Sequence, residues 1–82
     1  MTKETRKHIT AISKQNEMTR NEFMFILHNL FDSKAYDMAK AINETPSYLV
    51  DIVNYRKILN KEIQAKLIKL CSDKVKKKTK AS

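Results

Sequence analysis

The chain has 82 residues, with 17 lysine and arginine side chains against nine aspartate and glutamate side chains, so its formal net charge is +8. This length suffices for one small domain. It argues against an enzyme with a deep, walled active site. The positive balance favours an anionic partner, such as nucleic acid or an acidic surface.

Composition also bears on where the protein works and on what it binds. Cys71 is the only cysteine, so we expect a small buried apolar side chain and no disulfide. The N-terminus lacks an apolar signal segment, and no window approaches the ~18 apolar residues of a membrane span. We therefore expect a cytoplasmic protein without a membrane contact. His8 and His28 have no cysteine or carboxylate at metal spacing, and no catalytic arrangement is recognisable, so we expect no metal, no cofactor and no enzyme activity.

Apolar residues recur at three and four positions, which predicts an all-α protein, a compact domain of four to five helices. The first helix is expected from Thr2 to about Ser13. Its only clear apolar anchors are Ile9 and Ile12. Because this face is so weakly apolar, we expect the helix to pack as an appendage.

The second helix has the strongest start signal in the chain. Thr19 and Glu22 form a capping box, and Met18 and Phe23 occupy the flanking positions of a hydrophobic staple. The apolar face continues along this helix to about Phe31.

The third helix is expected to begin after Asp32 and Ser33, either of which can cap it. Its sequence is "KAYDMAKAI". Four residues are expected to face inward, namely Ala35, Met38, Ala39 and Ile42.

A short turn and a further helix follow in "NETPSYLVDIV". Asn43 stands where the chain needs a left-handed residue, because the chain has no glycine. Thr45 is a suitable N-cap, and Pro46 suits the first helical position. Leu49 and Ile52 are then expected to face inward. Ser47, Tyr48, Val50, Asp51 and Asn54 are left on or near the outside.

The last helix is expected to begin at Asn60, a plausible cap, and to pack through Ile63, Leu67 and Leu70. Lys61, Lys66 and Lys69 are expected to point outward. We expect one helical domain over residues 1–73, with a helix-turn-helix at 34–55. Residues 74–82 are expected to be a basic disordered tail, with a non-specific affinity for polyanions that resides in Lys74, Lys76, Lys77, Lys78 and Lys80.

Residues 19–70 resemble the helix-turn-helix domain of the phage repressor and Cro family. The most specific part runs from Met38 to Ile52, where Met38-Ala39 stands in the family's Leu-Ala position and "TPSYLVDI" is similar to the start of a recognition helix. Asn43 replaces the usual turn glycine. Glu44 stands where the family usually buries an aliphatic side chain.

The resemblance implies a transcriptional regulator that binds double-stranded DNA, a repressor of phage or plasmid type that acts as a homodimer on a two-fold site. It places base contacts at Pro46, Ser47, Val50 and Asp51. It places contacts with the DNA backbone at Lys34, Asn54, Tyr55, Arg56 and Lys57.

Two alternatives stay open from the residues themselves. Asp51 can form a salt bridge with Lys57 or another nearby cation, instead of accepting a hydrogen bond from cytosine. Tyr48 can pack against a neighbouring helix instead of stacking on a base. The near-neutral core, Asp51, and exposed Tyr48 and Val50 favour a second function, that of a helix-turn-helix-shaped inhibitor or adaptor that docks a protein partner.

Overall fold

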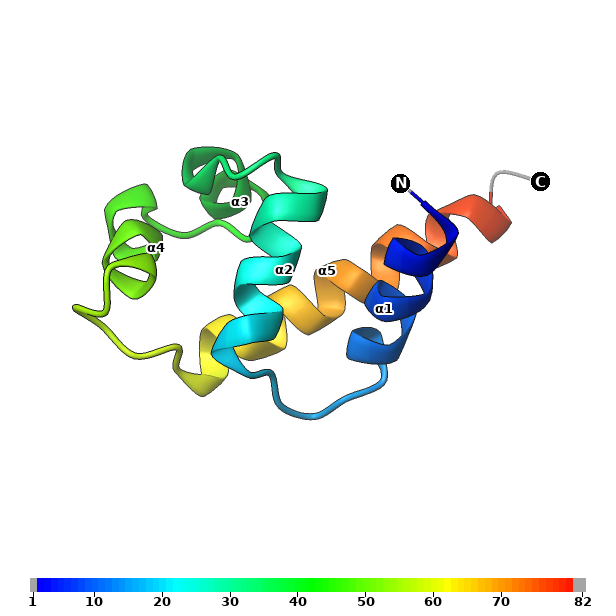
Figure 1. Ribbon diagram of the computed structural model, residues 1–82, viewed down its shortest axis with the longest axis horizontal. Coiled ribbons are helices and arrows are strands. Elements are labelled where there is room, and N and C mark those ends of the chain that lie inside the picture. The colour runs from blue at the N-terminus through cyan, green and yellow to red at the C-terminus, as the bar shows by residue number, and fades with distance from the viewer. Residues whose placement is uncertain (1, 81–82) are drawn as a thin grey trace.

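The computed structural model describes the backbone of residues 2–80 and side chains through Val75. Within these residues the chain forms five helices and no strand, which confirms the predicted all-α class with a helix-turn-helix in the middle of the chain. The helices are α1 Lys3–Ser13, α2 Arg20–Leu30, α3 Ala35–Ala41, α4 Pro46–Val53 and α5 Lys61–Lys80. The molecule measures 41 × 22 × 20 Å, with α4 at one end and α1 with the last turns of α5 at the other (Figure 1).

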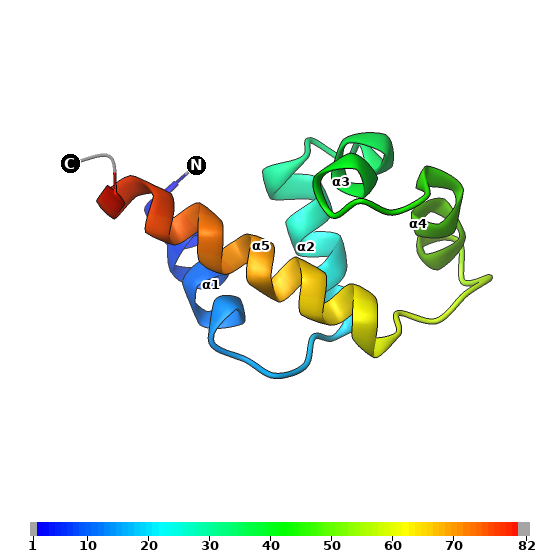
Figure 2. The same ribbon diagram turned by 180° about the vertical axis from the view of Figure 1, so that it is seen from behind.

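Helix α1 is an integral part of the fold, so the expectation of an appended helix is wrong. It lies along the C-terminal half of α5, and both views of the ribbon show the pair side by side (Figures 1 and 2). Ile9 and Ile12 are fully buried. The Arg6 guanidinium adds a long hydrogen bond to the Val75 carbonyl, at 3.5 Å.

One hydrophobic core holds all five helices together. Its buried members are Ile9, Ile12, Met18, Phe23, Ile26, Leu27, Met38, Ala39, Ile42, Leu49, Ile52, Ile63, Leu67 and Cys71. No polar or charged residue is buried among the described residues. Burial raises the pKa of the Cys71 thiol to about 11, so this side chain is neutral at physiological pH and packs as a small apolar group, as predicted.

The start of α2 confirms the predicted capping box. The Thr19 hydroxyl accepts from the Glu22 N–H at 3.1 Å, and the Glu22 carboxylate accepts from the Thr19 N–H at 2.9 Å. Burial alone would raise the pKa of Glu22, but the hydrogen bonds from Thr19 and Gln15 outweigh it and lower that pKa below its usual value. Met18 and Phe23 are both buried, as the staple requires.

Polar and aromatic residues take the left-handed turn positions in this chain without glycine. Asn43 has φ 59°, which confirms its predicted role at the end of α3. The Glu44 N–H donates to the Ala39 carbonyl at 2.8 Å, which completes a Schellman turn. Asp32 and Ser33 are also left-handed, with φ 53° and 65°, and the N-cap of α3 is Lys34, without a side-chain hydrogen bond. The prediction that Asp32 or Ser33 caps α3 is therefore wrong, because both residues build the preceding turn.

Asn43 offers a direct test of this turn. Asn43→Gly is expected to raise the free energy of unfolding by up to about 1 kcal/mol, because glycine adopts positive φ without a Cβ clash. Asn43→Ala is expected to lower it by about 1 kcal/mol for the opposite reason. Urea unfolding of both variants measures the difference, and equal stabilities would contradict a left-handed residue 43.

Helix α5 has a side-chain cap at its start and extends to the end of the described backbone. The Asn60 side chain accepts from the Ile63 N–H at 2.9 Å, so the predicted cap is confirmed. The buried face contains Ile63, Leu67 and Cys71, and Leu70 is only half-buried. The helical backbone continues to Lys80, in the segment where the sequence indicated a frayed helix that passes into a disordered tail. Residues 81 and 82 of that predicted tail lie outside the described range.

The described helices also bear on membrane insertion. In the part of the chain that the structure covers, no helix is both long and apolar enough to cross a membrane.

Candidate nucleic-acid interface

The outer face of α4 lies at one end of the molecule, turned away from the core. Leu49 and Ile52 are fully buried, which directs the opposite side of the helix to solvent. Among the predicted base-contact residues, Ser47 and Val50 are exposed, and Pro46 and Asp51 are partly buried. Pro46 holds the predicted first helical position, and Thr45 is the N-cap but makes no side-chain capping bond.

Asp51 is engaged in an ion pair. Its carboxylate lies 3.2 Å from the Arg56 guanidinium, and the two side chains are 27% and 68% exposed. Of the two uses open to Asp51, the structure shows the salt bridge, with Arg56 as its partner instead of Lys57. The pair reduces the negative charge that the face of α4 would present to a phosphate, although an exposed pair of this kind adds little stability.

A left-handed tyrosine ends α4. Tyr55 has φ 66° and its N–H donates to the Ile52 carbonyl at 3.2 Å. The Arg56 N–H donates to the Asp51 carbonyl at 2.8 Å, so this turn is again of the Schellman type. Because a bulky residue at positive φ is unfavourable by about 1–2 kcal/mol, other contacts must compensate for the strain.

Arg20 supplies those contacts from the first turn of α2. Its guanidinium donates to the Ile52 carbonyl and, at 2.6 Å, to the Val53 carbonyl. The same group lies over the Tyr55 ring, 3.8 Å from its centroid. Arg20 therefore satisfies two carbonyls at the C-terminus of α4 and holds the tyrosine in place.

The predicted backbone-contact residues fall into two groups. Asn54, Tyr55, Arg56 and Lys57 are all exposed in the turn after α4, whereas Lys34 is exposed at the start of α3. A cleft of about 320 Å³ is lined by Arg20, Tyr55, Arg56, Lys57, Ile58 and Leu59. Three cationic side chains thus share one small concave surface, a suitable arrangement for a phosphate group.

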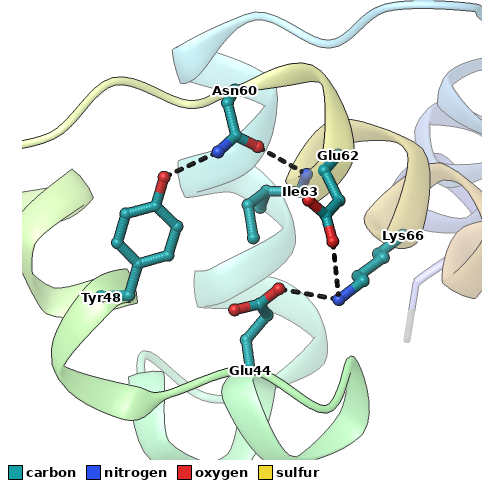
Figure 3. A network of polar contacts seen from close by, with 6 residues as sticks. All are labelled: Glu44, Tyr48, Asn60, Glu62, Ile63 and Lys66. Atoms are coloured by element: carbon teal, nitrogen blue, oxygen red, sulfur yellow. Dashed lines mark hydrogen bonds and ion pairs between the residues drawn. The ribbon is translucent and has the colours of Figure 1, made fainter.

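Tyr48 joins α4 to α5, which is the packing role that the sequence left open. Its hydroxyl accepts from the Asn60 side-chain amide at 2.7 Å, and Asn60 in turn caps α5 (Figure 3). The Lys57 ammonium lies 5.4 Å from the Tyr48 ring centroid. One aromatic residue therefore links the outer helix, the basic turn and the start of α5.

A second link joins the turn between α3 and α4 to α5. The Lys66 ammonium lies 2.7 Å from the Glu44 carboxylate and 3.6 Å from that of Glu62 (Figure 3). The hydrogen bond with Glu44 raises the pKa of Lys66 above its usual value. Lys66 was predicted to point outward, but it turns to Glu44. The ion pair explains how a carboxylate is accommodated where the resembled family buries an aliphatic side chain.

The helical backbone of residues 74–80, which belong to the predicted basic tail, lies at the other end of the molecule from α4 (Figure 1). Lys74 is exposed there. The side chains of Lys76, Lys77, Lys78 and Lys80 lie outside the described ones.

Neither histidine is part of a cluster. The His8 ring packs on the Phe25 ring with centroids 4.1 Å apart. Among the residues that the structure covers, no group of three or more histidine, cysteine, aspartate and glutamate side chains could hold a metal ion.

Comparison with known proteins yields no relative. No family model, no curated protein and no solved structure matches this chain.

Proposed function

We propose that the chain is a small DNA-binding regulator that inserts α4 into the major groove of double-stranded DNA. The observation that carries the proposal is the exposed face of α4, held at one end of the molecule and bordered by the cationic cleft of Arg20, Arg56 and Lys57. A helix of this kind, positioned by a preceding helix, is the usual reader of base edges in helix-turn-helix proteins.

The exposed side chains support only modest reading of sequence. Ser47 can donate or accept a hydrogen bond, and Val50 can contact a thymine methyl group. Asp51 is paired with Arg56 and can accept from cytosine only if that pair opens. We therefore expect backbone contacts by Arg56, Lys57 and Lys34 to supply most of the affinity.

The proposal includes the regulatory role that the resemblance implies. A repressor of this type acts as a homodimer, and two copies of α4 then read the two halves of a two-fold site. A palindromic target is therefore expected.

Replacing Arg56 and Lys57 by alanine together tests the backbone contacts. Loss of two phosphate contacts is expected to weaken binding to every duplex sequence and to reduce the magnitude of the negative slope of log K against log salt by about 1.8. Fluorescence anisotropy of a labelled 30-base-pair duplex over a salt series measures both quantities.

The matched control is Lys40→Ala with Lys61→Ala, since both side chains are exposed and the charge change is the same. The control is expected to keep most of the affinity and slope. If the two double variants behave alike, the turn after α4 does not contact the backbone, and the proposed docking is wrong.

A second function is favoured by the charge and apolar exposure of the helix-turn-helix half. Residues 15–73 carry eight basic and eight acidic side chains, and are therefore neutral overall. Tyr36, Tyr55 and Ile58 are 64%, 82% and 79% exposed. A neutral surface with exposed aromatic and aliphatic groups suits a protein partner. In an isotope-edited NMR titration with duplex DNA, shifts confined to residues 74–80 would favour this function over DNA reading by α4.

A further inference from the structure

The net charge of the protein is concentrated at the end opposite α4. Residues 1–14 and 74–82 together carry nine basic side chains and one acidic side chain, and the remaining residues are balanced. The fold brings the described parts of these two segments together, because α1 packs along the C-terminal half of α5 and Arg6 reaches the Val75 carbonyl. Two charge excesses that are far apart in the sequence thus become one basic end.

The outward face of α1 gives this end a regular pattern. Lys3 and Lys7 of the helix, and Lys14 at its C-cap, lie on one side of α1, opposite the stripe of Ile9 and Ile12 that is buried in the core. All three lysines are exposed. Among the described side chains, none of the three lies within ion-pair distance of a carboxylate; the pairs seen involve Arg56, Lys61 and Lys66.

The chemistry of the face fits a phosphate backbone better than a lipid surface. An open depression of about 770 Å³ is lined by Lys3, Arg6, Lys7 and Lys14, together with Glu4, Thr10 and Ala11. These residues provide positive charge and small side chains but no large apolar group. A helix that inserts into a membrane surface buries such apolar groups at the acyl boundary, whereas a DNA backbone requires only cations.

The basic end and the exposed face of α4 cannot contact the same short stretch of a duplex. The buried residues of α4 face the core, which lies between α4 and the basic end, so its exposed face points away from that end (Figures 1 and 2). The long dimension of the molecule is 41 Å.

We propose that Lys3 and Lys7 of α1, with Lys14 at its C-cap, form a second DNA-backbone surface, so that one chain holds two duplex segments. Phosphate binding by this surface stands independently of α4. The bridging of two duplexes rests on the function proposed above, because it requires α4 to hold the first one.

The first test measures this surface in the Arg56→Ala/Lys57→Ala background, which weakens binding through α4, and compares that full-length chain with and without Lys3→Gln/Lys7→Gln/Lys14→Gln. For a 30-base-pair duplex, loss of three phosphate contacts is expected to reduce the magnitude of the negative slope of log K against log salt by about 2.7. The matched control is Lys40→Gln/Lys61→Gln/Lys69→Gln, which removes three exposed lysines from the neutral part of the chain. Thermal unfolding monitors that both variants fold. A slope that falls equally in both variants, or in neither, would overturn the second surface.

The second test measures bridging. One duplex is immobilised and saturated with protein, and capture of a second, fluorescent duplex is recorded. Wild type and control are expected to capture it. In the α1 triple variant, the fluorescence of the captured duplex is expected to fall about fivefold or more. Capture that survives in the triple variant would mean that the second duplex sits on the α4 of another copy, which would overturn the proposal.

Two further outcomes separate the possible failures. If the α1 lysines contribute to the salt dependence but wild type captures no second duplex, the basic end binds DNA and bridging is wrong. If the duplex affinity is then unchanged in Arg56→Ala/Lys57→Ala, α4 does not bind DNA. Vesicles that contain phosphatidylserine provide the competing surface. If the triple variant loses vesicle binding and keeps its duplex affinity, the occupant is a membrane and the proposal is wrong.

Discussion

Replacing Arg20 by methionine is expected to lower the free energy of unfolding by about 2 kcal/mol, because hydrogen bonds from a charged group each contribute about 1.5–3 kcal/mol and partial exposure reduces that. Methionine keeps most of the aliphatic stem but cannot donate to the Ile52 and Val53 carbonyls. It also removes the cation from the Tyr55 ring, and the strained left-handed tyrosine loses its support. Urea unfolding measures the stability change.

Arg56→Met is the matched control for this prediction. It removes the same charge from an exposed guanidinium in the turn after α4, whose ion pair with Asp51 is expected to contribute at most about 1 kcal/mol. Hydrogen exchange adds a local readout. In Arg20→Met, the amides of Tyr55 and Arg56 are expected to lose protection before the core does. If both variants are equally stable, Arg20 does not hold the end of α4.

Ile9→Ala is expected to lower the free energy of unfolding by about 3 kcal/mol, within the range for large-to-small substitutions in a core. Ile9 projects from α1 into the core and is fully buried, so truncation of its side chain leaves a cavity that neighbouring side chains can fill only in part. For a domain of this size, such a loss corresponds to a fall in Tm of more than about 10 °C. Differential scanning calorimetry measures it.

The control for Ile9→Ala is Lys7→Ala, which changes the exposed side of the same helix. Alanine is a good helix former, so this variant is expected to stay within about 0.5 kcal/mol of the wild type. A loss of less than about 0.5 kcal/mol in Ile9→Ala would mean that α1 is appended to the domain rather than part of it.

The predictions that the structure confirms rest on short stretches of sequence. The capping box of Thr19 and Glu22, the left-handed Asn43 and the cap at Asn60 each involve residues within about four positions, so the local pattern contains the whole physical cause. The packing of α1 was missed for the opposite reason. Two isoleucines form a weak amphipathic face, and only their distant partner α5 makes that face buried. Asp32 and Ser33 were misassigned because the residues that suit an N-cap also tolerate positive φ.

The candidate site was only partly predictable for the same reason. The sequence identified α4 and the basic turn after it, but not Arg20, which comes from α2 and reaches across to the end of α4. One signal was available: a cation in the first turn of a helix is unfavourable with the helix dipole and often has a partner elsewhere. The pairing of Glu44 with Lys66 depends on how α3 and α5 meet, so no local pattern contains it.

Charge placement is a further result of the fold. The sequence shows a basic C-terminal segment, and α1 together with its C-cap contributes three more exposed lysines once the helix lies beside α5. The helix-turn-helix half is then neutral. The additional, sequence-independent backbone contact and the reading of sequence are thus expected to reside at different ends of the molecule.

The claim that α4 reads DNA is tested most directly by selection from random-sequence duplexes at moderate salt. The intact chain is compared with Ser47→Glu/Val50→Glu, which places two carboxylates on the exposed face of α4 and leaves the core unchanged. The wild type is expected to enrich one palindromic motif, and the variant is expected to lose it while it keeps its fold and its non-specific affinity. If the wild type enriches no motif, or the variant enriches the same one, α4 does not read DNA.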